Sequence, residues 1–74
     1  MKLSALQQNQ TAVIKKIDCS AELKQRFYSF GIIEGTNIKI ETISLAKNTM
    51  EINVEDTSIG LRVDEAKHIE VELV

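Results

Sequence analysis

Cys19 and His68 are the side chains best suited to nucleophilic chemistry, because the chain has one cysteine and one histidine. A cysteine acts as a catalytic nucleophile when a base lies beside it. Nothing in the sequence indicates that these two residues approach each other in space. We therefore interpret Cys19 as a loop cysteine and His68 as a half-exposed strand histidine. The sequence therefore predicts no catalytic residue and a protein that is not an enzyme.

A metal or cofactor site is not indicated either. Transition metals require several histidine, cysteine or carboxylate ligands that converge, and the sequence has neither a Cys-x-x-Cys nor a His-x-x-x-His motif. Most carboxylates of the second half alternate with apolar residues, which is typical of a solvated strand face. Gly31 and Gly35 are not followed by Gly-Lys-Ser or Gly-Lys-Thr, so they do not form a phosphate-binding loop. We predict no metal and no cofactor.

Arg26 and Arg62 suggest a different chemistry, because an arginine inserted into the site of a GTPase stabilises charge in the transition state. The simpler interpretation gives both residues structural partners. Arg26 follows Glu22 by four residues, which is the spacing of an ion pair along one helix face, and Arg62 would pair with a residue on a neighbouring strand. We favour this structural interpretation over insertion into a GTPase.

The charge pattern disfavours nucleic acid as a partner. The 74 residues include 9 basic and 11 acidic ones, for a net charge of -2, and Lys15-Lys16 is the only basic doublet. Proteins that bind nucleic acid or anionic lipid usually present a basic face. We therefore expect neither class of partner.

The sequence also predicts a cytoplasmic protein without membrane insertion. Met1–Gln8 carries a positive charge but no apolar run behind it, so it does not have the form of a secretory signal peptide. No stretch approaches the ~20 apolar residues that span a bilayer. A single cysteine permits no internal disulfide, which is consistent with a reducing compartment.

The first half of the chain predicts one strand followed by one amphipathic helix. Thr11–Ile17 is rich in β-branched residues and reads as a strand. Ser20 is a suitable helix cap, and Gly31 is a suitable helix stop. Apolar residues expected to share the core face of this helix recur at i, i+4 and i+7: Leu23, Phe27 and Phe30.

From Thr36 onward, apolar and polar residues alternate with a period of two, which predicts strands with one buried face. The apolar positions fall in four groups: Ile38 and Ile40; Met50, Ile52 and Val54; Ile59, Leu61 and Val63; Ile69, Val71 and Leu73. With the first strand this makes five. Five strands with a single apolar face must curl to bury it, so we predict a mainly β fold, a small barrel that forms a single domain over residues 1–74.

The connections have recognisable turn residues. Gln8-Asn9-Gln10 predicts a turn in which Asn9 adopts a left-handed conformation. Asp56-Thr57 predicts a tight turn between two strands. Asp64–Lys67 predicts a single helical turn before the last strand.

The ordered motifs of the chain resemble those of ferrous iron transport protein A, the FeoA family of small bacterial SH3-like barrels. The resemblance covers nearly the whole chain and rests on these segments: Leu3 and Leu6, Ile14-Lys15-Lys16-Ile17, Arg26-Phe27, Phe30-Gly31-Ile32-Ile33-Glu34-Gly35, Ile59-Gly60-Leu61-Arg62, Glu65-Ala66 and Ile69-Glu70-Val71.

This resemblance implies an accessory role in bacterial ferrous iron uptake. The expected partner is FeoB, the membrane transporter of the same system, which carries a cytosolic GTP-binding domain. Docking would regulate the transporter by shifting its conformational equilibrium. Two alternatives stay open: an SH3-like adaptor for an unrelated protein, and a small protein that carries iron.

Tyr28, Ile33 and Leu45 are the predicted partner-binding residues. If Phe27 and Phe30 face the core, then Tyr28 points away from it. Ile32 and Ile33 cannot both be buried easily at the helix exit, and we assign Ile32 to the core. Leu45 falls in a loop. Exposed aromatic and aliphatic side chains are typical of interaction sites. Open barrel edges would in addition permit self-association.

Overall fold

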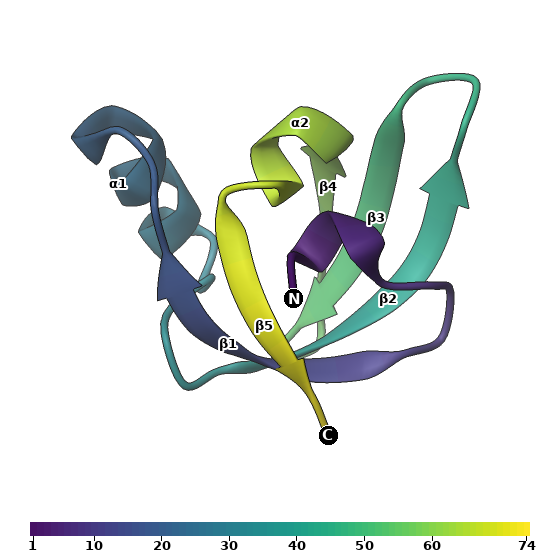
Figure 1. The fold of residues 1–74 in the computed structure, drawn as a ribbon, viewed down its shortest axis with the longest axis horizontal. Coiled ribbons are helices and arrows are strands. Elements are labelled where there is room, and N and C mark those ends of the chain that lie inside the picture. Colours follow the sequence, from purple (N-terminus) through teal and green to yellow (C-terminus); the bar gives the residue numbers. More distant parts are fainter.

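Five antiparallel strands form one sheet in the computed structural model, which describes all residues 1–74 (Figure 1). Along the chain the elements are η1 (Leu3–Ala5), β1 (Thr11–Ile17), α1 (Ala21–Ser29), β2 (Asn37–Ser44), β3 (Thr49–Val54), β4 (Thr57–Arg62), α2 (Val63–Ala66) and β5 (Ile69–Leu73). The strand order in the sheet is β4-β3-β2-β1-β5. The prediction of a mainly β fold with five strands and a helix after the first strand is confirmed.

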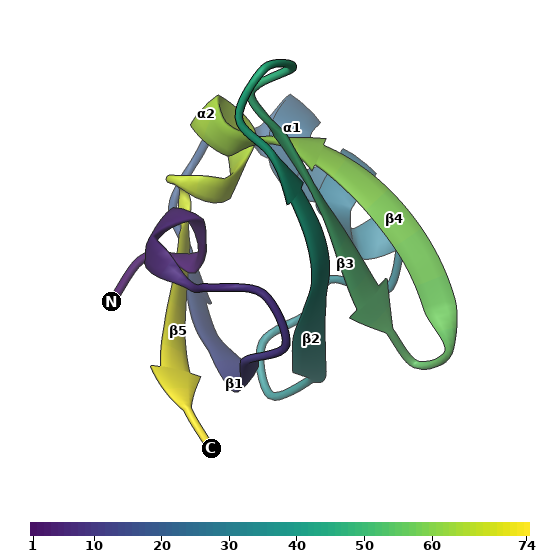
Figure 2. The ribbon, with the colours of Figure 1, turned by 90° about the vertical axis from the view of Figure 1, so that its right-hand side faces the viewer.

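Two register shifts bend the sheet. One lies in β1 between Ile14 and Lys16, opposite β5, and the other lies in β2 between Ile40 and Thr42, opposite β3. An extra residue in one strand of an antiparallel pair bends that strand and increases its twist. The sheet consequently curves so strongly that β5 lies at the front and β4 at the back of the view in Figure 1, and Figure 2 shows the same curvature from the side.

The core fills the inside of this curve and contains only apolar side chains. Seventeen residues are buried, and no buried residue is polar or charged. Met50, Ile52 and Val54 of β3 are buried as their alternation predicts. Ile38 and Ile40 of β2 are buried in the same way. Burial of alternate residues along each strand leaves the opposite face of the sheet polar.

Helix α1 has the predicted beginning and end. The Ser20 hydroxyl accepts a hydrogen bond from the Leu23 N–H at 3.2 Å, which satisfies a backbone donor of the first turn. At the other end Gly31 has a φ of 85°, and the N–H of Ile32 donates to the Phe27 carbonyl at 3.0 Å. This hydrogen bond closes a Schellman turn. The turn directs Ile32 into the core, where it is fully buried.

Four details of the predicted structure are wrong. Val63, predicted to continue the strand of Ile59 and Leu61, instead begins α2 and is half-buried. Phe30 is not a core residue, because it is the C-cap of α1 and the chain turns away after it; its side chain is 39% exposed. Leu73 takes the last position of β5 and is 46% exposed, so the core on this strand ends at Val71. The tight turn lies at Glu55–Asp56 instead of Asp56-Thr57, and the φ angles of Glu55 and Asp56, 50° and 66°, are those of a two-residue hairpin turn.

The prediction for Asn9 is confirmed: its φ of 72° is left-handed.

The N-terminus covers one of the two edges of the sheet. Lys2 forms a β-bridge with Glu70, and the N–H of Val71 donates to the Met1 carbonyl at 2.8 Å. Lys2 Nζ lies 3.0 Å from Glu70 Oε1, and the Met1 ammonium lies 3.2 Å from Glu70 Oε2. These contacts hold the pKa of Glu70 below its ordinary value of 4.5, and the hydrogen bond from Lys2 has the largest effect. Strand β5 is therefore closed on both sides, whereas β4 pairs only with β3.

Because Phe27 is the buried side chain of α1, we expect it to contribute most of the free energy that holds this helix against the sheet. We expect Phe27→Ala to lower the free energy of unfolding by about 3–5 kcal/mol, because it removes a fully buried ring and leaves a cavity. Phe30→Ala is the matched control, and we expect it to cost about 1 kcal/mol or less. Urea denaturation followed by circular dichroism measures both. Equal losses would contradict the assignment of Phe30 to the surface.

The lowered pKa of Glu70 predicts a pH-dependent contribution to stability. A carboxyl whose pKa is lower in the folded state stabilises the fold above its unfolded pKa, and that contribution is lost as the pH falls through the folded pKa. We expect Glu70→Gln to lower the Tm at about pH 7, with the difference from the unmodified protein narrowing towards about pH 3. Glu72→Gln, at a more exposed ion pair of 3.7 Å, should change the Tm less. A Tm difference for Glu70→Gln that does not change with pH would contradict this.

Candidate protein-binding site

Tyr28 and Ile33 lie at the C-terminal end of α1 and in the turn that follows it. Tyr28 is 39% exposed and Ile33 is 45% exposed, whereas the neighbouring Phe27 and Ile32 are buried. Phe30, between them in the sequence, is equally exposed. We call Tyr28, Phe30 and Ile33 the helix-end cluster. Sequence reasoning missed Phe30 because it treated the helix periodicity as continuing to the residue at which the helix ends.

Leu45 lies elsewhere. It is 91% exposed in the turn between β2 and β3. Figure 1 places this hairpin on the side of the molecule opposite α1. Tyr28, Phe30 and Ile33 therefore surround the C-terminal end of α1, with Lys24 beside the Tyr28 ring and Arg26 beside the Phe30 ring. Leu45 does not lie at this end of the helix (Figure 1).

Charged neighbours fix the orientation of Tyr28. Its hydroxyl donates to Glu34, with distances of 3.1 and 3.3 Å to the two carboxylate oxygens. Lys24 Nζ lies 5.8 Å from the centre of the tyrosine ring and 3.9 Å from Glu34 Oε2. A backbone hydrogen bond at Glu34, together with Tyr28 and Lys24, holds the pKa of Glu34 below 4.5. The ring is thus held in place on the surface, which lowers the entropy that a partner must overcome to bind it.

Arg26 links α1 to α2. Its Nη1 lies 2.9 Å from Glu65 Oε2, so the predicted pair with Glu22 is wrong. The reason is that Glu65 is held nearby, since its other oxygen accepts a hydrogen bond from the Arg62 N–H at 3.0 Å. The guanidinium group of Arg26 also lies 6.0 Å from the centre of the Phe30 ring. The side chain of Arg62 forms no ion pair, so its predicted pairing across strands is wrong as well.

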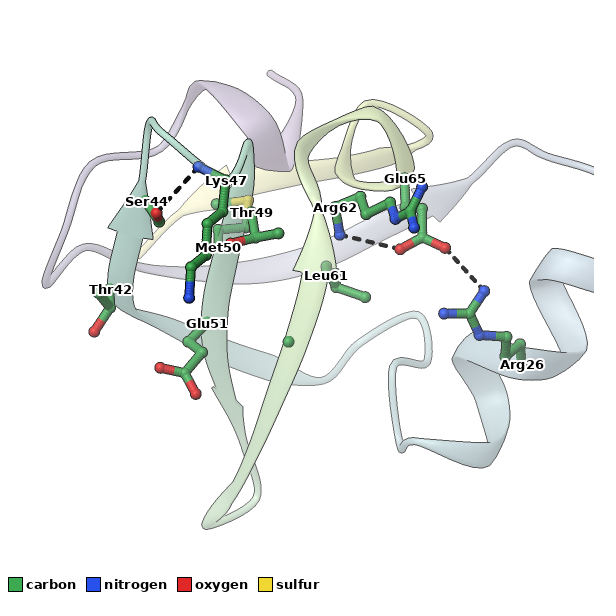
Figure 3. A pocket seen from close by; sticks show the side chains of 11 residues that line it. Arg26, Thr42, Ser44, Lys47, Thr49, Met50, Glu51, Leu61, Arg62 and Glu65 are labelled. Atoms are coloured by element: carbon green, nitrogen blue, oxygen red, sulfur yellow. Dashed lines mark hydrogen bonds and ion pairs between the residues drawn. The ribbon is translucent and has the colours of Figure 1, made fainter.

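A polar hollow of about 570 Å³ lies beside this bridge (Figure 3). Its walls come from the ends of β2, β3 and β4 and from Arg26 on α1. Lys47, Arg62 and Glu51 contribute charged groups, and only two of the lining residues are hydrophobic. Figure 3 shows the Lys47 side chain lying along β3 and, on the other side of the hollow, the Arg26 side chain directed at Glu65.

The Cys19 thiol donates to the Ser20 carbonyl at 3.4 Å and forms no hydrogen bond with the His68 ring, although the two residues lie near each other through the backbone of Asp18. The Asp18 N–H donates to the His68 carbonyl at 2.9 Å, and His68 Nδ1 donates to the Asp18 carbonyl at 3.1 Å. His68 lies in the turn before β5, not in a strand. Burial is the main cause that raises the pKa of the Cys19 thiol, which disfavours the reactive thiolate. No group of three or more histidine, cysteine or carboxylate residues lies in an arrangement that could hold a metal ion.

Known proteins with the same sequence pattern share this architecture. The model of the FeoA domain family matches residues 1–73. The chain belongs to the FeoA family. A protein of Campylobacter jejuni named Fe(2+) transport protein A is 39% identical over 74 residues, which are 100% of each chain. The FeoA family is involved in Fe(2+) transport, and no helix of this member is long and apolar enough to cross a membrane.

Solved structures of FeoA proteins superimpose closely on this chain. The iron(II) transport protein A of Clostridium thermocellum is 34% identical with a TM-score of 0.94, covering 100% of this chain and 46% of that one. The FeoA of Stenotrophomonas maltophilia, solved with zinc and described as a prokaryotic SH3 domain protein, is 25% identical with a TM-score of 0.83, covering 97% of this chain and 89% of that one. The predicted SH3-like fold is thereby confirmed.

The contacts of Tyr28 predict a change in the titration of Glu34. We expect Tyr28→Phe to raise the pKa of Glu34 toward 4.5, because the hydroxyl donates to the ionised carboxylate. The backbone hydrogen bond should keep the pKa somewhat below that value. Carboxyl ¹³C NMR titration measures the shift. Ser29→Ala is the control, since the Ser29 hydroxyl donates to the Arg26 carbonyl instead. A pKa of Glu34 that is the same in both variants would contradict the role of Tyr28.

Proposed function

We propose that this chain is a non-catalytic cytoplasmic accessory protein of ferrous iron uptake, and that it binds the cytosolic part of FeoB. The observation that carries this proposal is the helix-end cluster on a member of the FeoA family. Two aromatic side chains and one aliphatic side chain are exposed around the end of α1, on a domain in which no group of histidine, cysteine and carboxylate residues could hold a metal ion. Exposed aromatic residues are enriched where proteins bind one another.

The charge of the chain supports a protein partner over a membrane or nucleic acid. The net charge is -2, and five of the nine basic side chains are held in ion pairs with carboxylates of the same chain. The arrangement of Arg26 also counts against a role for it in GTP hydrolysis, since its guanidinium is bound to Glu65 on the same chain. The proposed regulation therefore acts through binding, by different affinities for two states of the transporter.

The experiment that tests this function is calorimetric titration of the protein into purified full-length FeoB, with and without a GTP analogue. We expect saturable binding whose affinity depends on the nucleotide. A complete absence of heat in both states, with both proteins folded, would overturn the proposal. Equal affinity in both states would support docking and contradict regulation through the nucleotide state.

Charge substitutions can show whether the partner binds at the helix-end cluster or at the β2–β3 turn that carries Leu45. We expect Ile33→Asp and Tyr28→Asp each to weaken binding by about tenfold or more, because each places a charge in an apolar contact. Leu73→Asp is the matched control, since Leu73 is 46% exposed against 45% for Ile33 and is the last residue of β5, the strand that ends at the C-terminus. Leu45→Asp tests the β2–β3 turn separately. Full affinity in Ile33→Asp and Tyr28→Asp would exclude the helix-end cluster as the docking surface.

A further inference from the structure

Strand β4 has an open edge whose hydrogen-bonding groups can be read from its register. The two-residue turn makes Val54 and Thr57 a hydrogen-bonded pair, and such pairs alternate along an antiparallel ladder. The backbone groups of Ser58 and Gly60 therefore point away from β3. None of the 19 backbone hydrogen bonds outside the regular elements involves either residue. Two N–H and two C=O groups are thus available to a further strand.

The other edge of the sheet is not available in this way. Met1 and Lys2 pair with β5 at Glu70 and Val71 and hold the outer N–H and C=O of Val71. An exposed edge strand is a template for pairing with another chain, and proteins usually cover or block such edges. The chain covers one edge with its own N-terminus and leaves β4 open.

Gly60 keeps the open edge unobstructed. It lies inside β4, without the positive φ that would require glycine. A Cβ built at this position would meet no heavy atom within 4 Å, so packing does not require glycine either. Glycine weakens a strand and often marks a place where another backbone or a ligand approaches closely. Gly60 is therefore one of the two positions of β4 whose N–H and C=O face outward, and it has no side chain.

The polar hollow adjoins this edge and carries unpaired positive charge. Gly60 and Arg62 of β4 line it, and Arg26 of α1 lines its other side. Arg26 is paired with Glu65, but the side chains of Lys47 and Arg62 have no ion-pair partner. Glu51 is the only other carboxylate among the lining residues. A ligand with carboxylate groups would therefore be complementary in charge.

We propose that the edge of β4 binds an extended acidic segment of a partner protein as an additional strand. The backbone of the segment would bond to Ser58 and Gly60, while its acidic side chains would reach Arg62 and Lys47 in the hollow. Main-chain hydrogen bonds supply affinity in this mode of recognition, and the side-chain contacts supply specificity. This inference rests on the proposed function, since it describes how the partner is held.

A second copy of the chain fits the edge less well. Two β4 strands paired with each other would each contribute Thr57–Arg62, which contains an arginine and no acidic residue. The segment would bring positive charge to a hollow that is already positive. The β5 edge of a second copy is covered by its own Met1 and Lys2.

Hydrogen–deuterium exchange in the complex with full-length FeoB tests the proposed strand addition directly. We expect the amides of Ser58 and Gly60 to exchange quickly in the free protein and to slow by about tenfold or more in the complex, because each gains a hydrogen-bond acceptor. Unchanged exchange at both amides in a complex that forms would overturn the inference and leave the proposed function intact. No complex with the unmodified protein would overturn both.

Two pairs of variants separate the backbone contact from the charge contact. Gly60→Pro removes an outward N–H and leaves the β3 ladder intact, so we expect binding to weaken by about tenfold or more. Gly60→Ala keeps that N–H and should lose less. Arg62→Gln should weaken binding and reduce its dependence on salt, whereas Lys16→Gln, at an exposed cation without an ion pair, should not.

Thermal denaturation of each variant checks that it is folded. If Gly60→Pro fails to fold, the exchange rates of Ser58 and Gly60 and the affinity of Arg62→Gln still test the inference. Full affinity in Arg62→Gln together with unprotected Ser58 and Gly60 would overturn the inference.

Discussion

The curvature of the sheet controls the rest of the structure, because a chain of 74 residues can enclose a core only if its single sheet closes around it. The two register shifts in β1 and β2 supply that curvature. The seventeen buried side chains then all face one enclosed space. A flat sheet of the same strands would expose one apolar face to water, at a free-energy cost of roughly 25 cal/mol for each Å² exposed.

Curvature without full closure leaves two strand edges, and the chain treats them differently. The edge of β5 is covered by Met1 and Lys2 through backbone and charge contacts. The edge of β4 ends at Arg62, whose N–H is capped by Glu65. The same Glu65 holds Arg26 and so connects α1 to the end of this strand. One carboxylate therefore positions the helix, ends the open strand and borders the polar hollow.

Helix α1 is attached to the barrel by few side chains, and this explains its exposed apolar end. Phe27 and Ile32 enter the core, and the glycine turn between them reverses the chain. Phe30 and Ile33, which precede and follow Gly31, remain outside the core, and Tyr28, next to Phe27 on the helix, is partly exposed as well. The exposed cluster is thus a consequence of burying Phe27 and Ile32 on either side of a Schellman turn. A single longer helix would have buried Phe30 instead.

Local patterns predicted most of this fold, and long-range contacts account for what they missed. The alternation in Met50–Val54 identified a strand, and Ser20 and Gly31 identified the helix ends, because each of these preferences acts within a few residues. The bridge from Arg26 to Glu65 spans 39 positions in the sequence and has no local pattern. The separation of Leu45 from Tyr28 depends in the same way on how the sheet curves. The backbone bonds between Asp18 and His68 also join positions far apart in the chain.

The side chains that could take part in chemistry are engaged in contacts within the chain, whereas other surface groups have no partner in it. Cys19 is a weak nucleophile because burial favours its neutral thiol, and His68 uses Nδ1 to hold the Asp18 carbonyl. The carboxylates with lowered pKa values, Glu34 and Glu70, accept hydrogen bonds from neighbouring donors. The groups that remain unpaired are the exposed side chains around the end of α1, the outward backbone groups of β4 and the cations Lys47 and Arg62 that line the hollow. These groups are the ones on which the proposed binding of a partner protein rests.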